Sequence, residues 1–225
     1  NMDLTIKFYV NDGYEVPEIQ VDPPVNFDSP EYQDMIENSL VSTGNNYRLK
    51  KVIEKCKRGE DVTIAYIGGS ITQGAGGKPI NTMCYAYRSY DAFCKLFSPC
   101  DGKNVHYVKA GVGGTPSELG MVRYDLDVTK NGEITPDLVV VEFAVNDWGW
   151  PYDGIFSDME AIVRKIRTRK PTADIIFIYT ATLYTTQALV TGSELESRSA
   201  HAAVAHYYGN ILSVDIGEVL RNSVN

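Results

Sequence analysis

Residues 62–72 have the sequence VTIAYIGGSIT, in which an apolar run leads directly into a glycine-rich turn. The run 62–67 predicts a β-strand covered on both faces, because its residues are almost continuously apolar or β-branched. Gly68 and Gly69 allow the backbone to approach a small molecule closely, and Ser70 follows them at once. The stretch therefore predicts a buried strand that carries a serine just beyond its carboxyl end.

Helices and strands alternate from this stretch to the end of the chain. A helix that ends before Gly59 precedes the stretch, and further helices are predicted at residues 83–97, 117–128, 155–166 and, from a capping box at Ser193 and Glu196, 193–208. Strands are predicted at residues 105–109, 138–143, 175–179 and 211–216. This alternation indicates a parallel sheet with helices on both faces. We therefore predict a three-layer α/β/α fold with five parallel strands in the order 2-1-3-4-5.

Residues 1–45 differ in character from the rest of the chain. Prolines at positions 17, 23, 24 and 30 interrupt them, and only residues 4–10 keep a strand-like alternation. We predict an N-terminal extension over residues 1–45 and a main domain over residues 46–225. The extension has three possible roles, as a strand added to the sheet, part of an accessory module or a wrapped arm.

The length and charge of the chain limit its partners. A chain of 225 residues with 44% hydrophobic residues predicts one folded domain. The net charge of −8 has the wrong sign for nucleic acid or an anionic membrane, and no apolar run is long enough to span a bilayer. We expect a soluble protein, cytoplasmic or exported, and the sequence leaves its oligomeric state open.

The four cysteines do not form a metal or redox motif. Cys56, Cys84, Cys94 and Cys100 lack CxxC spacing and are predicted to be buried thiols. If the protein is exported, Cys94 and Cys100 are close enough in sequence to form a disulfide. We expect no metal and no cofactor.

Two more turns with polar or glycine-rich sequence follow predicted strands, at residues 110–115 (AGVGGT) and 144–147 (AVND). The carboxyl ends of parallel strands meet at one edge of a sheet, so these turns are expected to converge near Ser70. Their spacing excludes three common motifs. Thr72 replaces a required glycine of both the P-loop and the GxSxG elbow, and Pro116 replaces the third glycine of a dinucleotide-binding turn.

This combination resembles the SGNH, or GDSL-like, hydrolases, a superfamily of esterases named for a Ser, a Gly, an Asn and a His in four separate blocks. Residues 67–72, 108–115 and 143–147 match three of the blocks, apart from Lys109, where relatives often have Asn. The resemblance covers residues 61–225 and implies a flavodoxin-like fold. It also implies that Ser70 is the nucleophile, and that the N–H groups of Ser70 and Gly114 and the side chain of Asn146 form the oxyanion hole.

The fourth block, a D-x-x-H segment after the fifth strand, is not matched. His106 begins the second predicted strand, at the far end of the sheet. His201 and His206 lie on the helix before the fifth strand, and neither has an aspartate three residues before it. We expect both to be surface or packing residues, the alternative being that one is the base. We therefore expect the catalytic histidine to lie beyond Asn225 and this chain to be a weak or inactive esterase.

The resemblance implies hydrolysis of small acyl esters, and we expect the substrates to carry acetyl groups on carbohydrates. Trp148, Trp150 and Tyr152 are expected either to stack on sugar rings or to pack onto the core. Asp147 is expected to hold the loop that carries the Asn, while Glu142 needs either an edge position or a buried partner. A non-catalytic ester- or glycan-binding module and an acyltransferase are the alternative functions.

Overall fold

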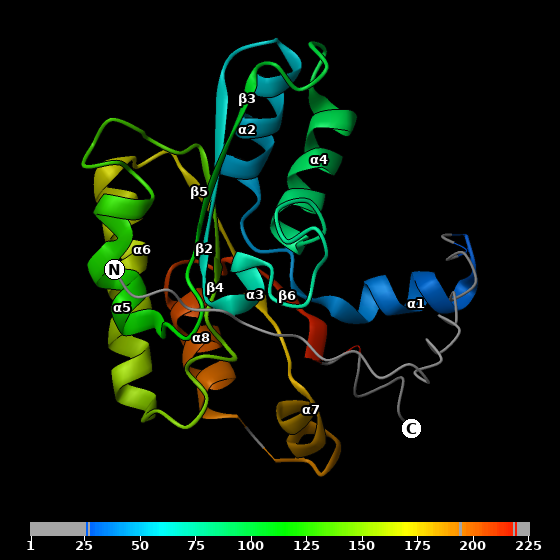
Figure 1. The fold of residues 1–225 in the computed structure, drawn as a ribbon, viewed down its shortest axis with the longest axis vertical. Coiled ribbons are helices and arrows are strands. Elements are labelled where there is room, and N and C mark those ends of the chain that lie inside the picture. The colour runs from blue at the N-terminus through cyan, green and yellow to red at the C-terminus, as the bar shows by residue number, and fades with distance from the viewer. Residues whose placement is uncertain (1–25, 27, 194, 218, 220–225) are drawn as a thin grey trace, which may run out of the picture.

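The described residues form a central sheet with helices around it (Figure 1). The computed structural model describes residues 26, 28–193, 195–217 and 219, so the alternating pattern at residues 4–10 lies outside the described part. The strands are β1 (Leu40–Ser42), β2 (Val62–Gly68), β3 (Val105–Gly111), β4 (Leu138–Glu142), β5 (Asp174–Tyr179) and β6 (Leu212–Asp215). The helices are α1 (Pro30–Ser39), α2 (Tyr47–Lys57), α3 (Ser70–Gln73), α4 (Tyr85–Phe97), α5 (Ser117–Asp127), α6 (Tyr152–Arg169), α7 (Leu183–Val190) and α8 (Glu196–Tyr207).

The order of the parallel strands confirms the prediction. β2 to β6 run parallel in the order β3-β2-β4-β5-β6, which is the predicted order 2-1-3-4-5. The predicted number of strands was wrong, because β1 pairs antiparallel with β6 and makes the sheet six-stranded. β1 has only three residues, too few for a periodic pattern to be visible in the sequence. Residues 40–42 thus take the role of an added strand, while the division of the chain at residue 45 stays a prediction.

The sheet separates two apolar cores. Within β2, Ala65 and Ile67 face the core that the sheet forms with α5, α6 and α8, whereas Ile64 and Tyr66 face the core formed with α2 and α4. Figure 1 shows these two groups of helices on opposite sides of the sheet. All five residues of β4 are buried, as expected for a central strand covered on both faces. The three-layer α/β/α arrangement is therefore confirmed.

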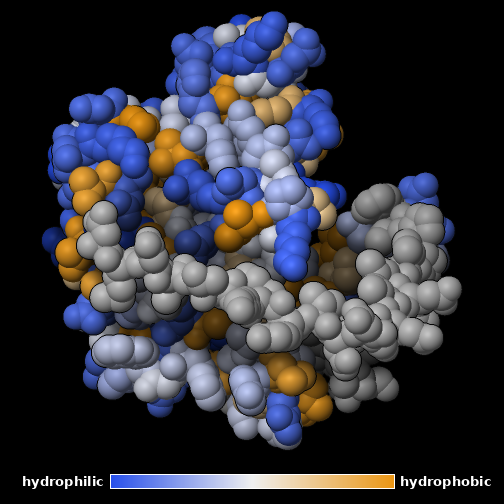
Figure 2. Space-filling view, viewed as in Figure 1, coloured by the Kyte–Doolittle hydropathy of each residue, from blue (hydrophilic) through white to orange (hydrophobic). Residues whose placement is uncertain are grey.

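The surface in view is hydrophilic over the end of the molecule where α2 and α4 lie, with small apolar groups between the polar ones (Figure 2). None of the helices in the described part of the chain is long and apolar enough to cross a bilayer.

Two local predictions were wrong. The capping box expected at Ser193 is absent, because α8 begins at Glu196 after Leu195 and the Ser193 amide instead closes the turn after α7 by donating to the Ala188 carbonyl. A capping box is present at the start of α7, between Thr182 and Thr185. All four cysteines are free, and Cys100 is exposed in the turn after α4 instead of buried.

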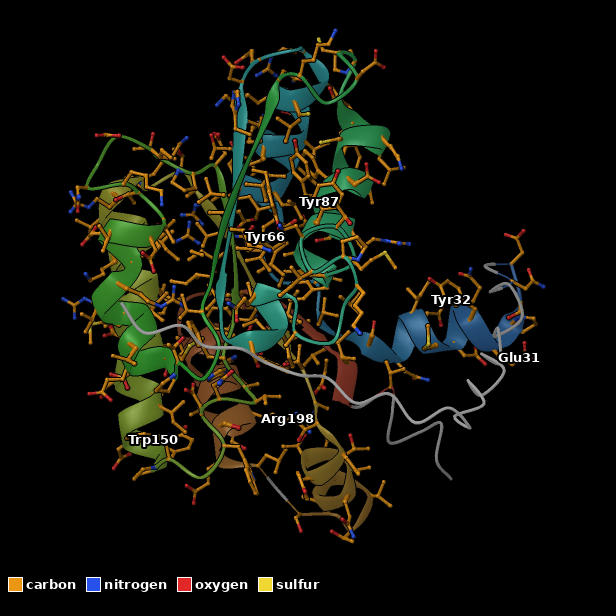
Figure 3. All side chains as sticks on the ribbon, in the orientation of Figure 1. Glu31, Tyr32, Tyr66, Tyr87, Trp150 and Arg198 are labelled. Carbon is orange, nitrogen blue, oxygen red and sulfur yellow. The ribbon has the colours of Figure 1, made fainter. Side chains whose placement is uncertain are left out.

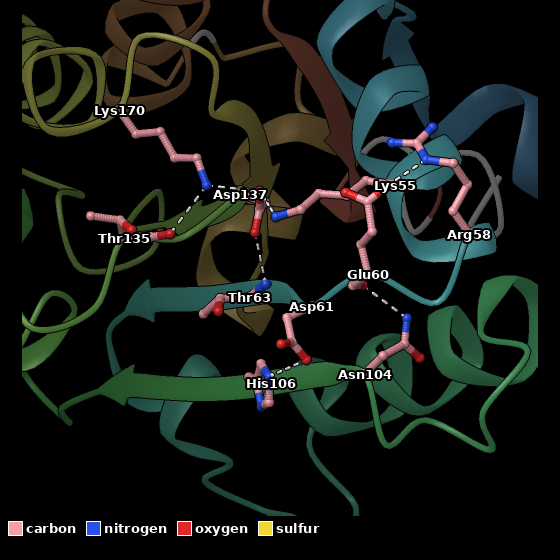
Figure 4. A network of polar contacts seen from close by, with 10 residues as sticks. All are labelled: Lys55, Arg58, Glu60, Asp61, Thr63, Asn104, His106, Thr135, Asp137 and Lys170. Carbon is pink, nitrogen blue, oxygen red and sulfur yellow. Dashed lines mark hydrogen bonds and ion pairs between the residues drawn. The ribbon is translucent and has the colours of Figure 1, made fainter.

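Ion pairs close the amino end of the sheet (Figure 4). This end lies away from Ser70, which follows the carboxyl end of β2. Asp137, just before β4, accepts hydrogen bonds from Lys55 at 2.9 Å and Lys170 at 2.7 Å. His106, on β3, pairs with Asp61 at 3.1 Å. His106 is therefore at the opposite edge from the carboxyl ends of the strands, as its position in the sequence predicts.

Candidate active site

Ser70 is the first residue of α3 and follows β2 after a single residue, Gly69. The short helix is closed at its far end by Gly74, whose amide donates to the Ser70 carbonyl at 2.9 Å. The Ser70 side chain is half-buried at the carboxyl edge of the sheet. The fold thus presents the serine on a tight strand-to-helix turn, as the sequence predicts.

The turn after β3 lies beside Ser70. The Gly113 amide donates to Gln73 Oε1 on α3 at 3.0 Å, and a Cβ atom added to Gly113 would lie 3.7 Å from the Ser70 Cβ. Gly114 has a φ of +74°, a backbone conformation that favours glycine, and it is exposed. The glycines after β3 therefore allow this turn to approach the serine.

Asn146, in the turn after β4, packs against Gly69. A Cβ atom added to Gly69 would lie 1.8 Å from Asn146 Oδ1 and 3.1 Å from its Nδ2, so only glycine leaves room for the amide. Asn146 Oδ1 is buried and has no hydrogen-bond partner among the described residues. The structure thus brings Ser70, the Gly113–Gly114 turn and Asn146 together, although the catalytic role of each stays a prediction.

Asp147 holds the Asn146 turn from behind. Its Oδ1 accepts a hydrogen bond from the Ser117 amide at 2.7 Å, and its Oδ2 accepts one from His201 Nε2 at 2.8 Å. The side chains of Asp147 and His201 are both only 1% exposed. These bonds fasten the turn to the start of α5 and to α8, which agrees with the expected holding role of Asp147 and places His201 in the interior behind the turn.

All three histidines have partners other than Ser70. His201 donates to Asp147, His106 pairs with Asp61, and His206, exposed on α8, bonds with Asn210 at 3.0 Å. In the part of the chain that the structure describes, no histidine therefore shares a hydrogen bond with the serine.

Two cations that the sequence does not single out as functional fix the strand ends. Arg123 of α5 donates to the carbonyls of Gly68 at 2.9 Å and Ala110 at 2.6 Å, and its side chain is only 13% exposed. Lys109, where relatives often have Asn, donates to the carbonyl of Gln73 at 3.1 Å and so ties α3 to β3. Arg123 and Lys109 thus add charged hydrogen bonds to carbonyls at the ends of β2, β3 and α3.

Glu142, at the end of β4, is fully buried behind the serine turn and has hydrogen-bond partners on two sides. Thr72 donates to its Oε2 at 3.0 Å and Thr180 to its Oε1 at 2.6 Å, while the Tyr85 hydroxyl lies 2.8 Å from Thr72 Oγ1. The network joins α3 and α4 to the ends of β4 and β5. Burial raises the pKa of Glu142 above its ordinary value, and the hydrogen bonds from the two threonines only partly oppose this.

Glu142 gives a testable pH dependence of stability. Because its pKa is raised by folding, the unfolded chain releases this proton at lower pH than the folded chain does, so Glu142 lowers the free energy of unfolding as pH rises above its ordinary pKa. Glu142→Gln removes this contribution. The test measures the free energy of unfolding of both proteins with denaturant from about pH 4 to about pH 7. As pH rises over this range, the stability of the variant relative to the wild-type protein is expected to increase steadily.

The exposed Glu133 provides the matched control, and Glu133→Gln is expected to show no such trend. A difference between Glu142→Gln and the wild-type protein that stays constant over this range would contradict the raised pKa.

The fold and the site together define the class of the protein. A doubly wound α/β fold with Ser, Gly and Asn at the ends of three successive strands is the arrangement of an SGNH hydrolase. Residues 66–223 match the family of GDSL-like lipases and acylhydrolases, and the chain belongs to this family.

Known relatives and solved structures resemble the chain in part. A crystal structure of a two-domain esterase active on acetylated mannans superposes with a TM-score of 0.69 and 31% identity over 84% of this chain and 46% of that one. The same esterase co-crystallised with mannopentaose gives a TM-score of 0.70 at 30% identity. The platelet-activating factor acetylhydrolase IB subunits alpha2 of chicken and human are 32% identical over 101 residues, which is 44% of this chain and 40% of theirs. The chain thus spans less than half the length of these proteins.

Proposed function

We propose that the protein is a serine esterase that removes small acyl groups, above all acetyl, from carbohydrates. The observation that carries the proposal is the convergence of Ser70, the Gly113–Gly114 turn and Asn146 at one edge of the sheet. The esterase active on acetylated mannans and the relatives named as acetylhydrolases support an acetyl group as the acyl part. The mannan esterase also supports a carbohydrate as the alcohol part.

The proposed mechanism has two steps. Ser70 Oγ attacks the carbonyl carbon of the ester, and the negative charge that forms on the carbonyl oxygen is stabilised by the N–H groups of Ser70 and Gly114 and by the Asn146 amide. Each such donor contributes roughly 3–4 kcal/mol in a site that excludes water. The intermediate then releases the sugar hydroxyl, which takes up a proton, and leaves the acetyl group on Ser70. Water cleaves this second ester and releases acetate.

The Ser70 hydroxyl must pass its proton to a base during the attack. His106, His201 and His206 all have other partners, so we assign this role to none of them. We propose instead that the base is a histidine of the D-x-x-H block in the family pattern.

The test of the proposal measures acetate release from acetylated manno-oligosaccharides and from 4-nitrophenyl acetate. It compares the 225-residue chain with a form of the protein that also carries a D-x-x-H block. The second form is expected to turn over both substrates. The first is expected to show only the residual rate that binding and oxyanion donors sustain, about 10³–10⁴ over water.

Two outcomes would contradict the proposal in different ways. Full activity of the 225-residue chain that is lost in His201→Ala would show that His201 is the base. Binding of the acetylated glycan without acetate release from either form would favour a glycan-binding module. This module is the second candidate function, because no histidine in the described part of the chain is bonded to Ser70.

A further inference from the structure

The turn that carries Asn146 continues into a surface rich in aromatic side chains. Trp148 and Trp150 are 54% and 51% exposed, so neither is packed into the core. They are also the only two tryptophans of the chain. Trp150 is four positions after Asn146, so their backbones lie within about 14 Å of each other. Figure 3 shows Trp150 near one end of α5 and α6.

Trp150 and Pro151 line two neighbouring hollows. One has a volume of about 360 Å³ and lies between the starts of α5 and α6, where its lining includes the buried residues Ser117 and Ile155. The other has a volume of about 470 Å³ and is lined by Trp148 and the start of α8. A ligand that lies across the indole of Trp150 would therefore contact both hollows. Two adjoining hollows suit an elongated ligand made of linked units better than a single compact group.

The charged groups at these hollows are all acidic. Glu118 and Asp158 line the first hollow together with the buried Asp147, and Glu196 lines the second. Burial raises the pKa of the Asp158 carboxyl, and the negative charges of Glu118 and Asp147 raise it further. Such a surface offers hydrogen-bond acceptors and repels anions, including the phosphate of a phospholipid headgroup.

We propose that Trp150 and the two hollows beside it form a binding subsite for a neutral oligosaccharide. The indole would stack on the apolar face of one sugar ring, and the carboxylates would accept hydrogen bonds from sugar hydroxyls. The inference rests on the proposed function, because it places the carbohydrate part of the ester on the surface that follows the Asn146 turn. It adds to that function by naming the residues that select a glycan.

The position of both tryptophans in this surface gives a direct test on the 225-residue chain. Tryptophan fluorescence is titrated with unacetylated mannopentaose, and affinity is measured by calorimetry. Because the chain has no other tryptophan, a saturable change in emission reports binding at this surface. Trp150→Ala is expected to weaken binding about 10-fold, because a tenfold change corresponds to about 1.4 kcal/mol, which is within the range for stacking on a large aromatic ring.

Two further variants control the result. Trp150→Phe keeps an aromatic face and is expected to retain most of the affinity. Tyr207→Ala removes a 72% exposed aromatic side chain of α8 that does not line either hollow, and it is expected to bind mannopentaose as the wild-type chain does.

The proposal is overturned if mannopentaose causes no saturable change, if Trp150→Ala binds it with unchanged affinity, or if choline or glycerophosphocholine binds in its place. These outcomes do not depend on catalysis. Failure of glycan binding would therefore leave ester hydrolysis by Ser70 intact, and an inactive Ser70 would leave the binding result intact.

Discussion

Replacing Ser70 with alanine is expected to abolish turnover of 4-nitrophenyl acetate by a form of the protein that carries the D-x-x-H block. Loss of the serine from a serine–histidine pair lowers kcat by on the order of 10⁶-fold, and the rate that remains comes from binding and the oxyanion donors. The fold should be retained, because Ser70 is half-buried and α3 is held by backbone bonds and by the contacts of Thr72 and Gln73. Steady-state kinetics and circular dichroism of the same preparation measure both expectations.

The exposed Ser157 on α6 provides the matched control, and Ser157→Ala should retain full turnover. An activated phosphonate ester gives an independent check, because one phosphonyl group should be added to the wild-type protein and none to Ser70→Ala. Equal turnover and equal labelling of the wild-type and Ser70→Ala proteins would refute nucleophilic catalysis by this serine.

Asn146→Ala is expected to lower kcat by about 10²–10³-fold, the loss that follows removal of one oxyanion donor. Stability should change little, because the substitution also removes Asn146 Oδ1, a buried oxygen without a hydrogen-bond partner among the described residues. Unpartnered buried oxygens reduce stability, so deleting one offsets the loss of packing. The expected signature is a large decrease in kcat with a change in the free energy of unfolding of within about 1 kcal/mol.

Kinetics and denaturant unfolding of the same variant distinguish a catalytic from a structural role of Asn146. Asn38→Ala, on the exposed surface of α1, serves as the control and should change neither quantity. A loss of activity that follows a comparable loss of stability would mean that Asn146 acts only by holding its turn.

The fold could be predicted wherever long apolar runs alternate with amphipathic helices. β2 and β4 are covered on both faces, so their residues are almost continuously apolar, a pattern that is visible in a single sequence. β1, with two of its three residues exposed, has no such pattern, and its place is fixed by pairing with β6 far along the chain. α1 was missed for a related reason, since none of its residues is buried.

The residues of the candidate site that directly follow a strand could be predicted from their positions along the chain. Ser70, Gly114 and Asn146 each follow a strand, and parallel strands place such residues at one edge. The contacts of Arg123, Glu142 and His201 could not be predicted, because each joins segments that are distant in sequence and that only the folded chain brings together. Their residue types alone would fit a surface helix, an edge strand or a packing position equally well.

The pairing of β1 with β6 also constrains when the sheet can be completed. Leu40 lies opposite Val214, so the open side of β6 is covered only after almost the whole described chain has been synthesised. Closing a loop of this length is costly and slow compared with local contacts. Until β1 docks, β6 is an uncovered strand edge that can pair with another molecule, and a newly made chain is then most prone to aggregate. In the folded protein β1 covers this side of β6, and with only three residues it is a short edge strand that offers little for another molecule to pair with.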